Sequence, residues 1–123
     1  MKKYAGTAIL CLYLPFAATT PAQERKPTFT TFEAPGAGTE AGQGTGAMSI
    51  NPEGDVAGWD VDGSGVWHGF VRAPDGTITT FNIKGAGTGS GQGTTPAIIN
   101  QEGAIDGSYV DEKNVSHGFL RLP

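Results

Sequence analysis

The sequence predicts an all-β fold built from two tandem copies of one unit. Residues 30–74 recur as residues 79–123 at a constant offset of 49, and 24 of the 45 paired positions are identical. Within each copy the apolar residues recur with a period of two rather than 3.6, which is typical of strands. A fixed period of this length is typical of repeat proteins, in which each copy is one supersecondary unit.

The N-terminus predicts export from the cell. Residues 1–22 have the pattern of a secretory signal peptide: the basic Lys2 and Lys3, an apolar run over residues 4–18, and small residues before the cleavage site. The apolar run is too short to span a membrane comfortably, so we expect no membrane span after cleavage. Cleavage also removes Cys11, the only cysteine, and with it any disulfide or thiol chemistry. A secreted, periplasmic or cell-surface protein is the expected product.

Charge and length limit the partners and the architecture. Loss of two lysines leaves 6 of the 8 basic residues against 12 acidic ones, so the formal net charge changes from −4 to −6. An acidic protein of this kind is a poor ligand for nucleic acid. Residues 23–27 are predicted to form a linker, and residues 28–123 form one small two-repeat β domain.

Turn residues divide each copy into short strands. Sequences such as 51–54, 62–65 and 73–76 supply the proline and glycine residues that tight hairpins need. The predicted strands lie near residues 47–51, 55–61, 66–73, 77–83, 96–100, 104–110 and 115–122.

The first unit therefore has four antiparallel strands, which is the size of a β-propeller blade. The units are predicted to span residues 35–83 and residues 84–123 plus 28–34, because the second unit lacks its own fourth strand. We expect the N-terminal strand, residues 28–34, to complete the last unit. The chain then closes on itself or on a neighbouring chain.

The glycine-rich stretches 35–46 and 84–95 contain no large apolar residue and are predicted to be flexible connections. Residues 36–41 formally match a dinucleotide-binding pattern. That chemistry requires the N-terminus of a helix to receive the phosphates, and no helix is predicted here. No cofactor is therefore expected.

The two copies resemble the HAF repeats of bacterial extracellular proteins, which are named after a His-Ala-Phe tripeptide. The resemblance rests on residues 50–58 and 99–107, on the turn that follows each, and on a His-Gly-Phe tripeptide in place of His-Ala-Phe. It implies an exported β-rich repeat protein and no catalytic residues. The residues that define the repeat are Asn51, Gly54, Gly58, His68, Gly69 and Phe70 in the first copy, and Asn100, Gly103, Gly107, His117, Gly118 and Phe119 in the second.

The sequence contains three groups that could carry chemistry. Asp60, Asp62 and Ser64 have the oxygen spacing of the start of a calcium loop, but Val71 stands where the bidentate Glu is needed, so a hairpin turn is expected instead. His68 and His117 occupy equivalent strand positions and are expected to bond to neighbouring turns.

The third group is aromatic: Trp59, Trp67 and Tyr109 are not repeated between the copies and could bind a ligand. The sequence thus favours an exported non-enzymatic protein with a binding or surface-interaction role. Its partner is unknown: self-association, an extracellular glycan or another protein. The alternatives are a carbohydrate-binding module and a small hydrolase or metal-dependent enzyme that uses the histidines.

Overall fold

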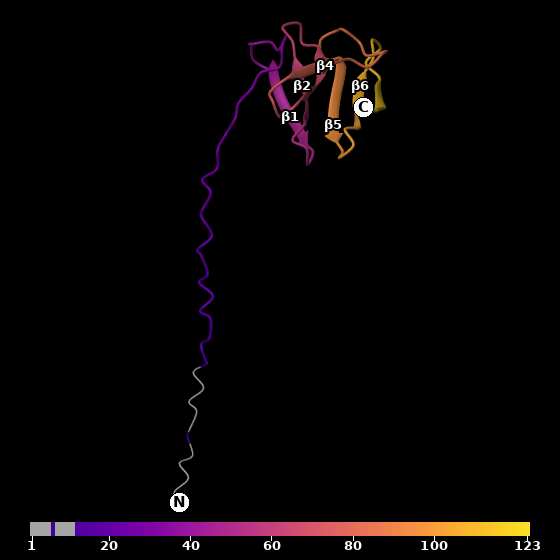
Figure 1. Cartoon of the computed structure of the whole chain (residues 1–123). Helices are drawn as coiled ribbons and strands as arrows, with labels where there is room; N and C mark the ends of the chain where they lie inside the picture. Colours follow the sequence, from indigo (N-terminus) through magenta and orange to yellow (C-terminus); the bar gives the residue numbers. More distant parts are fainter. Residues whose placement is uncertain (1–5, 7–11) are drawn as a thin grey trace, which may run out of the picture.

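The computed structural model describes Gly6 and residues 12–123, and the described part contains seven strands and no helix. Figure 1 shows these strands gathered at one end of the chain. They are β1 (Gly44–Ile50), β2 (Val56–Val61), β3 (Trp67–Arg72), β4 (Ile78–Phe81), β5 (Gly93–Ile99), β6 (Ile105–Val110) and β7 (Ser116–Arg121). The predicted all-β class is confirmed.

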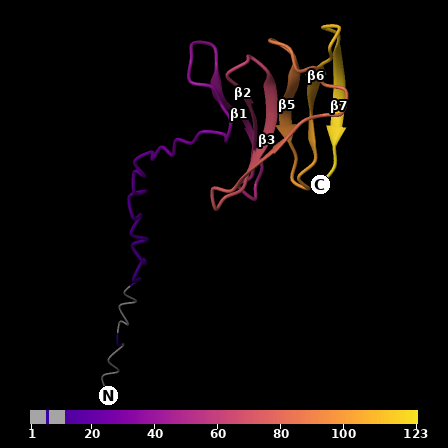
Figure 2. The same ribbon diagram turned by 90° about the horizontal axis from the view of Figure 1, so that it is seen from above.

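The strands follow the repeat but belong to one curled sheet. In the first unit β1, β2, β3 and β4 pair in chain order, each antiparallel to the next, and β5, β6 and β7 do the same in the second. A single parallel bridge between Trp67 and Gly93 joins the units. Figure 2 shows β1 and β7 at opposite ends of the arrangement. The units are therefore continuous with each other, which differs from the separate blades that the sequence suggested.

The first strand of each unit begins earlier than predicted, inside the glycine-rich stretch. Gly46 lies under the ring of Trp59, where an added Cβ would be 2.5 Å from the ring. Gly93 touches the backbone of Trp67, where a Cβ would be 2.0 Å from the carbonyl oxygen. These glycines allow close approach within the sheet, so the prediction of flexible connections is wrong at residues 44–46 and 93–95.

The side chain of one glutamine holds the remainder of each glycine-rich stretch in place through hydrogen bonds. Gln43 Oε1 accepts a hydrogen bond from Glu40 N–H at 3.1 Å, and its Nε2 donates to Gly63 O at 3.2 Å. Gln92 repeats this pattern, accepting from Gly89 N–H at 2.9 Å and donating to Glu112 O at 3.3 Å. Each glutamine ties its own loop to the β2–β3 or β6–β7 turn of the same unit.

Two equivalent aromatic pairs pack in the sheet. Phe70 in β3 is fully buried, and the ring of Phe32 meets it edge to face with the ring centroids 5.8 Å apart. Phe81 at the end of β4 meets Phe119 of the second unit in the same way at 6.3 Å. The core between the units consists of Ala57, Ile99 and Ile105, with Val71, Phe81 and Phe119 packed against it.

The structure differs from the prediction at residues 28–34. They form no strand and lie against the first unit rather than the last. Ala34 N–H donates to Thr45 Oγ1 at 2.9 Å, as Ile83 N–H donates to Thr94 Oγ1 at 3.0 Å. Residues 28–34 therefore contact the first unit in the same way as the end of β4 contacts the second unit. They do not complete the last unit.

Upstream of the sheet, residues 12–28 are exposed and extend away from it (Figure 1). Most of the basic and apolar part of the predicted signal peptide, residues 1–5 and 7–11, lies outside the described residues. Among the described residues, no helix is long and apolar enough to cross a membrane.

Candidate functional site

A small pocket of about 300 Å³ opens in the first unit where three segments meet. The ends of β2 and β3 form one side, the end of β4 forms another, and the loop after Ala34 covers the third. The lining residues are Pro35, Gly36, Asp60, Asp62, His68, Thr80 and Asn82. The volume lies at the lower end of the range for small-molecule sites.

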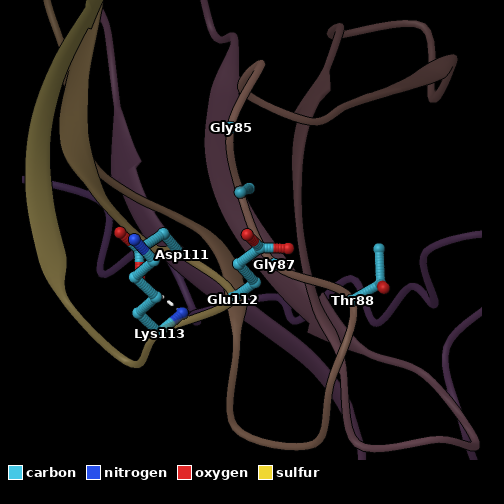
Figure 3. Close-up of a pocket in the computed structure, with 7 residues that line it drawn as sticks. Gly85, Gly87, Thr88, Asp111, Glu112 and Lys113 are labelled. Atoms are coloured by element: carbon cyan, nitrogen blue, oxygen red, sulfur yellow. Dashed lines mark hydrogen bonds between the residues drawn. The ribbon is translucent and has the colours of Figure 1, made fainter.

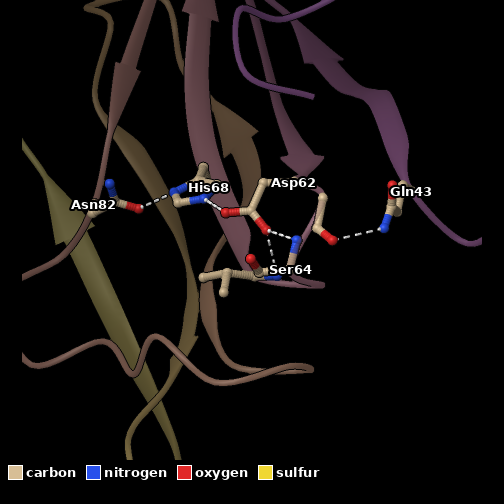
Figure 4. A network of polar contacts seen from close by, with 7 residues as sticks. Gln43, Asp62, Ser64, His68 and Asn82 are labelled. Carbon is tan, nitrogen blue, oxygen red and sulfur yellow. Dashed lines mark hydrogen bonds and ion pairs between the residues drawn. The ribbon is translucent and has the colours of Figure 1, made fainter. Parts of the chain in front are cut away.

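Hydrogen bonds at both ring nitrogens fix His68 in this pocket (Figure 4). Nε2 lies 2.8 Å from Asp62 Oδ2, and Nδ1 lies 2.8 Å from Asn82 Oδ1. The other carboxylate oxygen of Asp62 accepts hydrogen bonds from Ser64 N–H at 2.8 Å and Val66 N–H at 3.0 Å. Two oxygen acceptors on one imidazole suit the doubly protonated cation.

The pKa shifts follow these contacts. Burial tends to lower the pKa of His68, but the hydrogen bonds to Asp62 and Asn82 outweigh it, so this pKa is raised from its ordinary value of 6.5. The hydrogen bond from His68 lowers the pKa of Asp62, and the backbone N–H groups of Val66 and Ser64 lower it further. The two side chains therefore stabilise each other's charged forms, and they form an ion pair while His68 is protonated.

Asp60 is the unusual residue of the pocket. It stands directly opposite His68 in the β2–β3 register, and its side chain is only 1% exposed. Its Oδ1 atom is buried and has no hydrogen-bond partner among the described residues. Burial raises the pKa of Asp60, His68 opposes the rise, and Asp62 adds to it. An unpaired buried acceptor of this kind costs about 1–3 kcal/mol.

The second unit keeps the ion pair but not this carboxylate. His117 Nε2 lies 2.8 Å from Asp111 Oδ2. Tyr109 stands at the position of Asp60, and its ring stacks on the His117 ring with centroids 4.9 Å apart and an interplanar angle of 24°. The scaffold therefore accepts a neutral aromatic side chain where the first unit has Asp60.

A shallower hollow of about 580 Å³ lies beside this second ion pair (Figure 3). It is lined by residues 85–88 and 111–113. Asp111 there is held by its own turn, accepting hydrogen bonds from Lys113 N–H and Val115 N–H. Unlike the pocket at Asp60, this hollow contains no buried unpaired side-chain atom among the described residues.

The candidate calcium residues adopt the geometry of a hairpin turn. Both carboxylate oxygens of Asp62 are engaged, one by His68 and one by the backbone N–H groups of Ser64 and Val66. Asp60 is buried beside them and lines the pocket. Within residues 12–123, no group of three or more His, Cys, Asp or Glu residues is arranged to hold a metal ion.

The aromatic candidates do not gather in one place. Trp59 and Trp67 pack against each other with ring centroids 4.6 Å apart. The side chain of Trp59 lies on the opposite face of β2 from that of Asp60, because neighbouring residues of a strand point to opposite sides. Tyr109 belongs to the other unit. Trp67 also lines a groove of about 420 Å³ between the two glycine-rich loops.

The repeat-defining residues have structural contacts in both units. Asn51 Oδ1 accepts a hydrogen bond from Asp55 N–H at 2.9 Å, and Asn100 Oδ1 accepts one from Ala104 N–H at 2.8 Å. Gly54 and Gly103 complete these turns with φ angles of 91° and 85°, which favour glycine. Gly58 and Gly107 make room for the rings of Phe70 and Phe119, respectively.

Sequence reasoning singled out Asp60, Asp62 and His68 but not the other residues of the pocket. Thr80 and Asn82 come from the end of β4, and Pro35 and Gly36 come from the loop after the N-terminal segment. The sequence signal that could have indicated this pocket is that Asp60 of the first copy is replaced by Tyr109 in the otherwise similar second copy. Comparisons with protein-family models, curated proteins and solved structures find no match to this chain.

Proposed function

We propose that this chain is an exported, non-enzymatic binding protein whose ligand site is the pocket around Asp60. The ligand is a small molecule with hydrogen-bond donors, either the hydroxyl groups of a saccharide or an ammonium group. The unpaired Oδ1 of Asp60 carries this proposal, because a ligand donor that reaches it when the loop at Pro35 and Gly36 opens would satisfy it.

The charge of the pocket supports the same ligand class. Asp60 and Asp62 contribute two carboxylates and His68 one compensating positive charge, so the pocket is acidic when these groups are ionised. Such a site favours a hydroxyl donor or a cation over an anion. The exchange to Tyr109 in the second unit also supports a role in binding, because the fold itself does not require a carboxylate at this position.

The histidine geometry favours binding over catalysis. Both ring nitrogens of His68 face oxygen acceptors, so neither is free to act as a general base. His117 bonds to a different carboxylate, Asp111, in the other unit. The engagement of both ring nitrogens of His68 thus supports a binding role rather than the role of the histidine base of a hydrolase.

Nuclear magnetic resonance titration tests the proposal. Glucose, galactose, N-acetylglucosamine and ethanolamine are added to the wild type and to the Asp60→Asn and Asp60→Tyr variants. We expect one of these probes to shift the amide signals of Asp60, His68 and Asn82, and both variants to lose the response. Absence of any response at these residues, or an unchanged response in Asp60→Tyr, contradicts the proposal.

A second site is favoured by one observation. Trp67 lines the groove between the two glycine-rich loops together with Gln43, Ser64 and Ser90, and an aromatic ring beside polar groups is typical of saccharide sites. Saccharide binding that is lost in Trp67→Ala and kept in Asp60→Asn assigns the ligand to this groove instead.

A further inference from the structure

We propose that a second copy of this chain docks on the outer edge of β7, supplying its residues 29–32 as a fourth strand. The resulting head-to-tail contact repeats the junction that already exists between the two units. This inference concerns assembly and is independent of the ligand pocket at Asp60.

The two ends of the structure are complementary. Within the first unit β3 pairs with β4, whereas β7, the equivalent of β3, pairs only with β6 among the described residues. Residues 29–32 are the equivalents of β4 at the offset of 49, and they lie at the opposite end with no strand beside them. Among the described residues, β7 therefore has an open edge and residues 29–32 have no strand partner, and Figure 2 shows β7 and the N-terminal segment on opposite sides.

The observed register between β3 and β4 predicts the register of the new contact. Gly69 pairs with Phe81, Phe70 with Thr80, Val71 with Thr79 and Arg72 with Ile78. The equivalent pairs place Gly118, Phe119, Leu120 and Arg121 opposite Phe32, Thr31, Thr30 and Phe29 of the second copy. An added strand of this kind gains main-chain hydrogen bonds along an open sheet edge.

Gly118 gives the clearest local evidence. An added Cβ at Gly69 would lie 2.8 Å from the ring of Phe81 and 2.9 Å from Pro96, so this position must be glycine. At Gly118 the only heavy atom near such a Cβ is the oxygen of Gly107 at 4.0 Å, so nothing in its own chain requires glycine. Glycine weakens a strand interior. The ring of Phe32 from a second copy explains its presence.

Apolar side chains at both ends are exposed where their equivalents at the internal junction are covered. Val66 is 6% exposed but its equivalent Val115 is 49% exposed, and Leu120 on β7 is 68% exposed. At the other end Ile50 is 67% exposed, whereas its equivalent Ile99 is 5% exposed. Docking of one end on the other would cover both sets of side chains together.

The polar contacts of the internal junction can also be repeated. Trp67 N–H donates to Gln92 O and Gly91 N–H donates to Gly65 O, both at 2.8 Å. Asn51 Nδ2 donates to Asn100 O at 3.3 Å. In the new contact Ser116 N–H would donate to Gln43 O of the second copy, and Gly42 N–H of the second copy would donate to Asn114 O. Asn100 Nδ2 would donate to Asn51 O of the second copy.

Position 114 fits the same contact. Gly65 has little room for a side chain, because a Cβ there would be 2.6 Å from Ser90 Oγ. In the second unit this position is Asn114, and the residue equivalent to Ser90 in the docking copy is Ala41, which has no hydroxyl. The larger residue on one surface therefore meets the smaller residue on the other.

One residue opposes the contact. Ala57 is fully buried in the core between the units, but its equivalent in the second unit is the exposed Asp106. Docking would bring this carboxylate towards the apolar Ile50 and Val56 of the second copy, which costs free energy unless the charge is paired. Asp106 therefore weakens the association without changing its geometry, and its removal should strengthen the contact.

Sedimentation equilibrium over a range of concentrations tests this inference with two variants of opposite expected effect. We expect the mass of the wild type to rise with concentration towards multiples of the chain mass. Asp106→Ala should lower the concentration for half-association at least tenfold. Gly118→Val should remain monomeric with an unchanged thermal midpoint, because the added side chain blocks Phe32 of the second copy and contacts little in its own chain.

Gly63→Ala is the control, because its added Cβ would meet nothing within 4 Å and Gly63 is not among the residues proposed to pair with β7 of another copy. It should associate like the wild type. A wild type that stays monomeric at about 1 mM, an Asp106→Ala variant that associates no better, or a Gly118→Val variant that associates equally well overturns the inference. The last result would also indicate association through the exposed apolar residues upstream of the sheet.

Discussion

Substitution of Gly93 by alanine tests whether the glycine-rich stretches are ordered parts of the sheet. The φ angle of Gly93 is +122°, in the region that favours glycine, and its added Cβ would lie 2.0 Å from Trp67 O and 2.8 Å from Trp67 C and N. These are backbone atoms and cannot rotate away. The bridge that joins the two units must open, together with the hydrogen bond from Trp67 N–H to Gln92 O at 2.8 Å.

The magnitude follows from three contributions. A left-handed backbone costs a residue with a Cβ about 1–2 kcal/mol, overpacking costs about 1–3 kcal/mol, and a lost hydrogen bond costs about 1 kcal/mol. We therefore expect Gly93→Ala to lower the free energy of unfolding by about 3–6 kcal/mol. The control is Gly91→Ala, whose φ is +80° but whose Cβ would meet nothing within 4 Å, so only the backbone contribution of about 1–2 kcal/mol applies.

Urea denaturation followed by tryptophan fluorescence measures both variants, since Trp67 itself lies at the bridge. The midpoint should fall much further for Gly93→Ala than for Gly91→Ala, with similar slopes. Equal losses in the two variants would refute the reasoning, because a flexible connection would tolerate both substitutions alike.

Three further predictions concern stability. Phe81→Ala should lower the free energy of unfolding by about 3 kcal/mol, measured in urea, because it removes the ring between Gly69 and Phe119. Gln92→Ala should increase amide hydrogen exchange throughout residues 84–92, because the loop loses its hydrogen bonds to this side chain. The Asp62–His68 pair should stabilise most between the ordinary pKa values of 3.8 and 6.5; its contribution is lost as the pH rises through the raised pKa of His68 or falls through the lowered pKa of Asp62. Thermal midpoints across pH should show this dependence in the wild type and a weaker one in Asp62→Asn.

The strands could be predicted from the sequence because hairpin turns and alternating apolar residues are local signals. Seven of the eight predicted strands exist, all but the one at residues 28–34, and the first unit has its four strands in the expected order. The glycine-rich stretches were harder, because glycine composition does not distinguish a flexible loop from a place where two backbones approach closely. Only the neighbours of Gly46 and Gly93, distant in sequence, explain these residues.

The position of residues 28–34 could not be predicted for a related reason. The repeat offset correctly identified this segment as the equivalent of the end of β4, but each such segment has two neighbours. Phe81 both pairs with β3 through its backbone and packs its ring on Phe119 of the following unit. Phe32 keeps only the second contact, with Phe70. The offset alone does not say which of these two contacts is formed by Phe32.

The candidate site was only partly accessible from the sequence. The sequence predicted a hairpin turn rather than a calcium loop at Asp60, Asp62 and Ser64, but it did not predict that this turn, His68 and Asn82 surround a pocket. Burial of the unpaired Asp60 carboxylate depends on the loop at Pro35 and Gly36 and on the end of β4, which the sequence does not bring together.

The titration of the Asp60 carboxyl carbon, followed by nuclear magnetic resonance, is the most direct measurement of the pocket. We expect its midpoint above the ordinary value of 3.8, while the carboxyl carbon of Asp62 titrates below that value. A saturating hydrogen-bond donor ligand should lower the Asp60 midpoint, since the ionised carboxylate gains a partner. If Asp60 titrates at its ordinary value with or without such a ligand, the proposed binding site is contradicted.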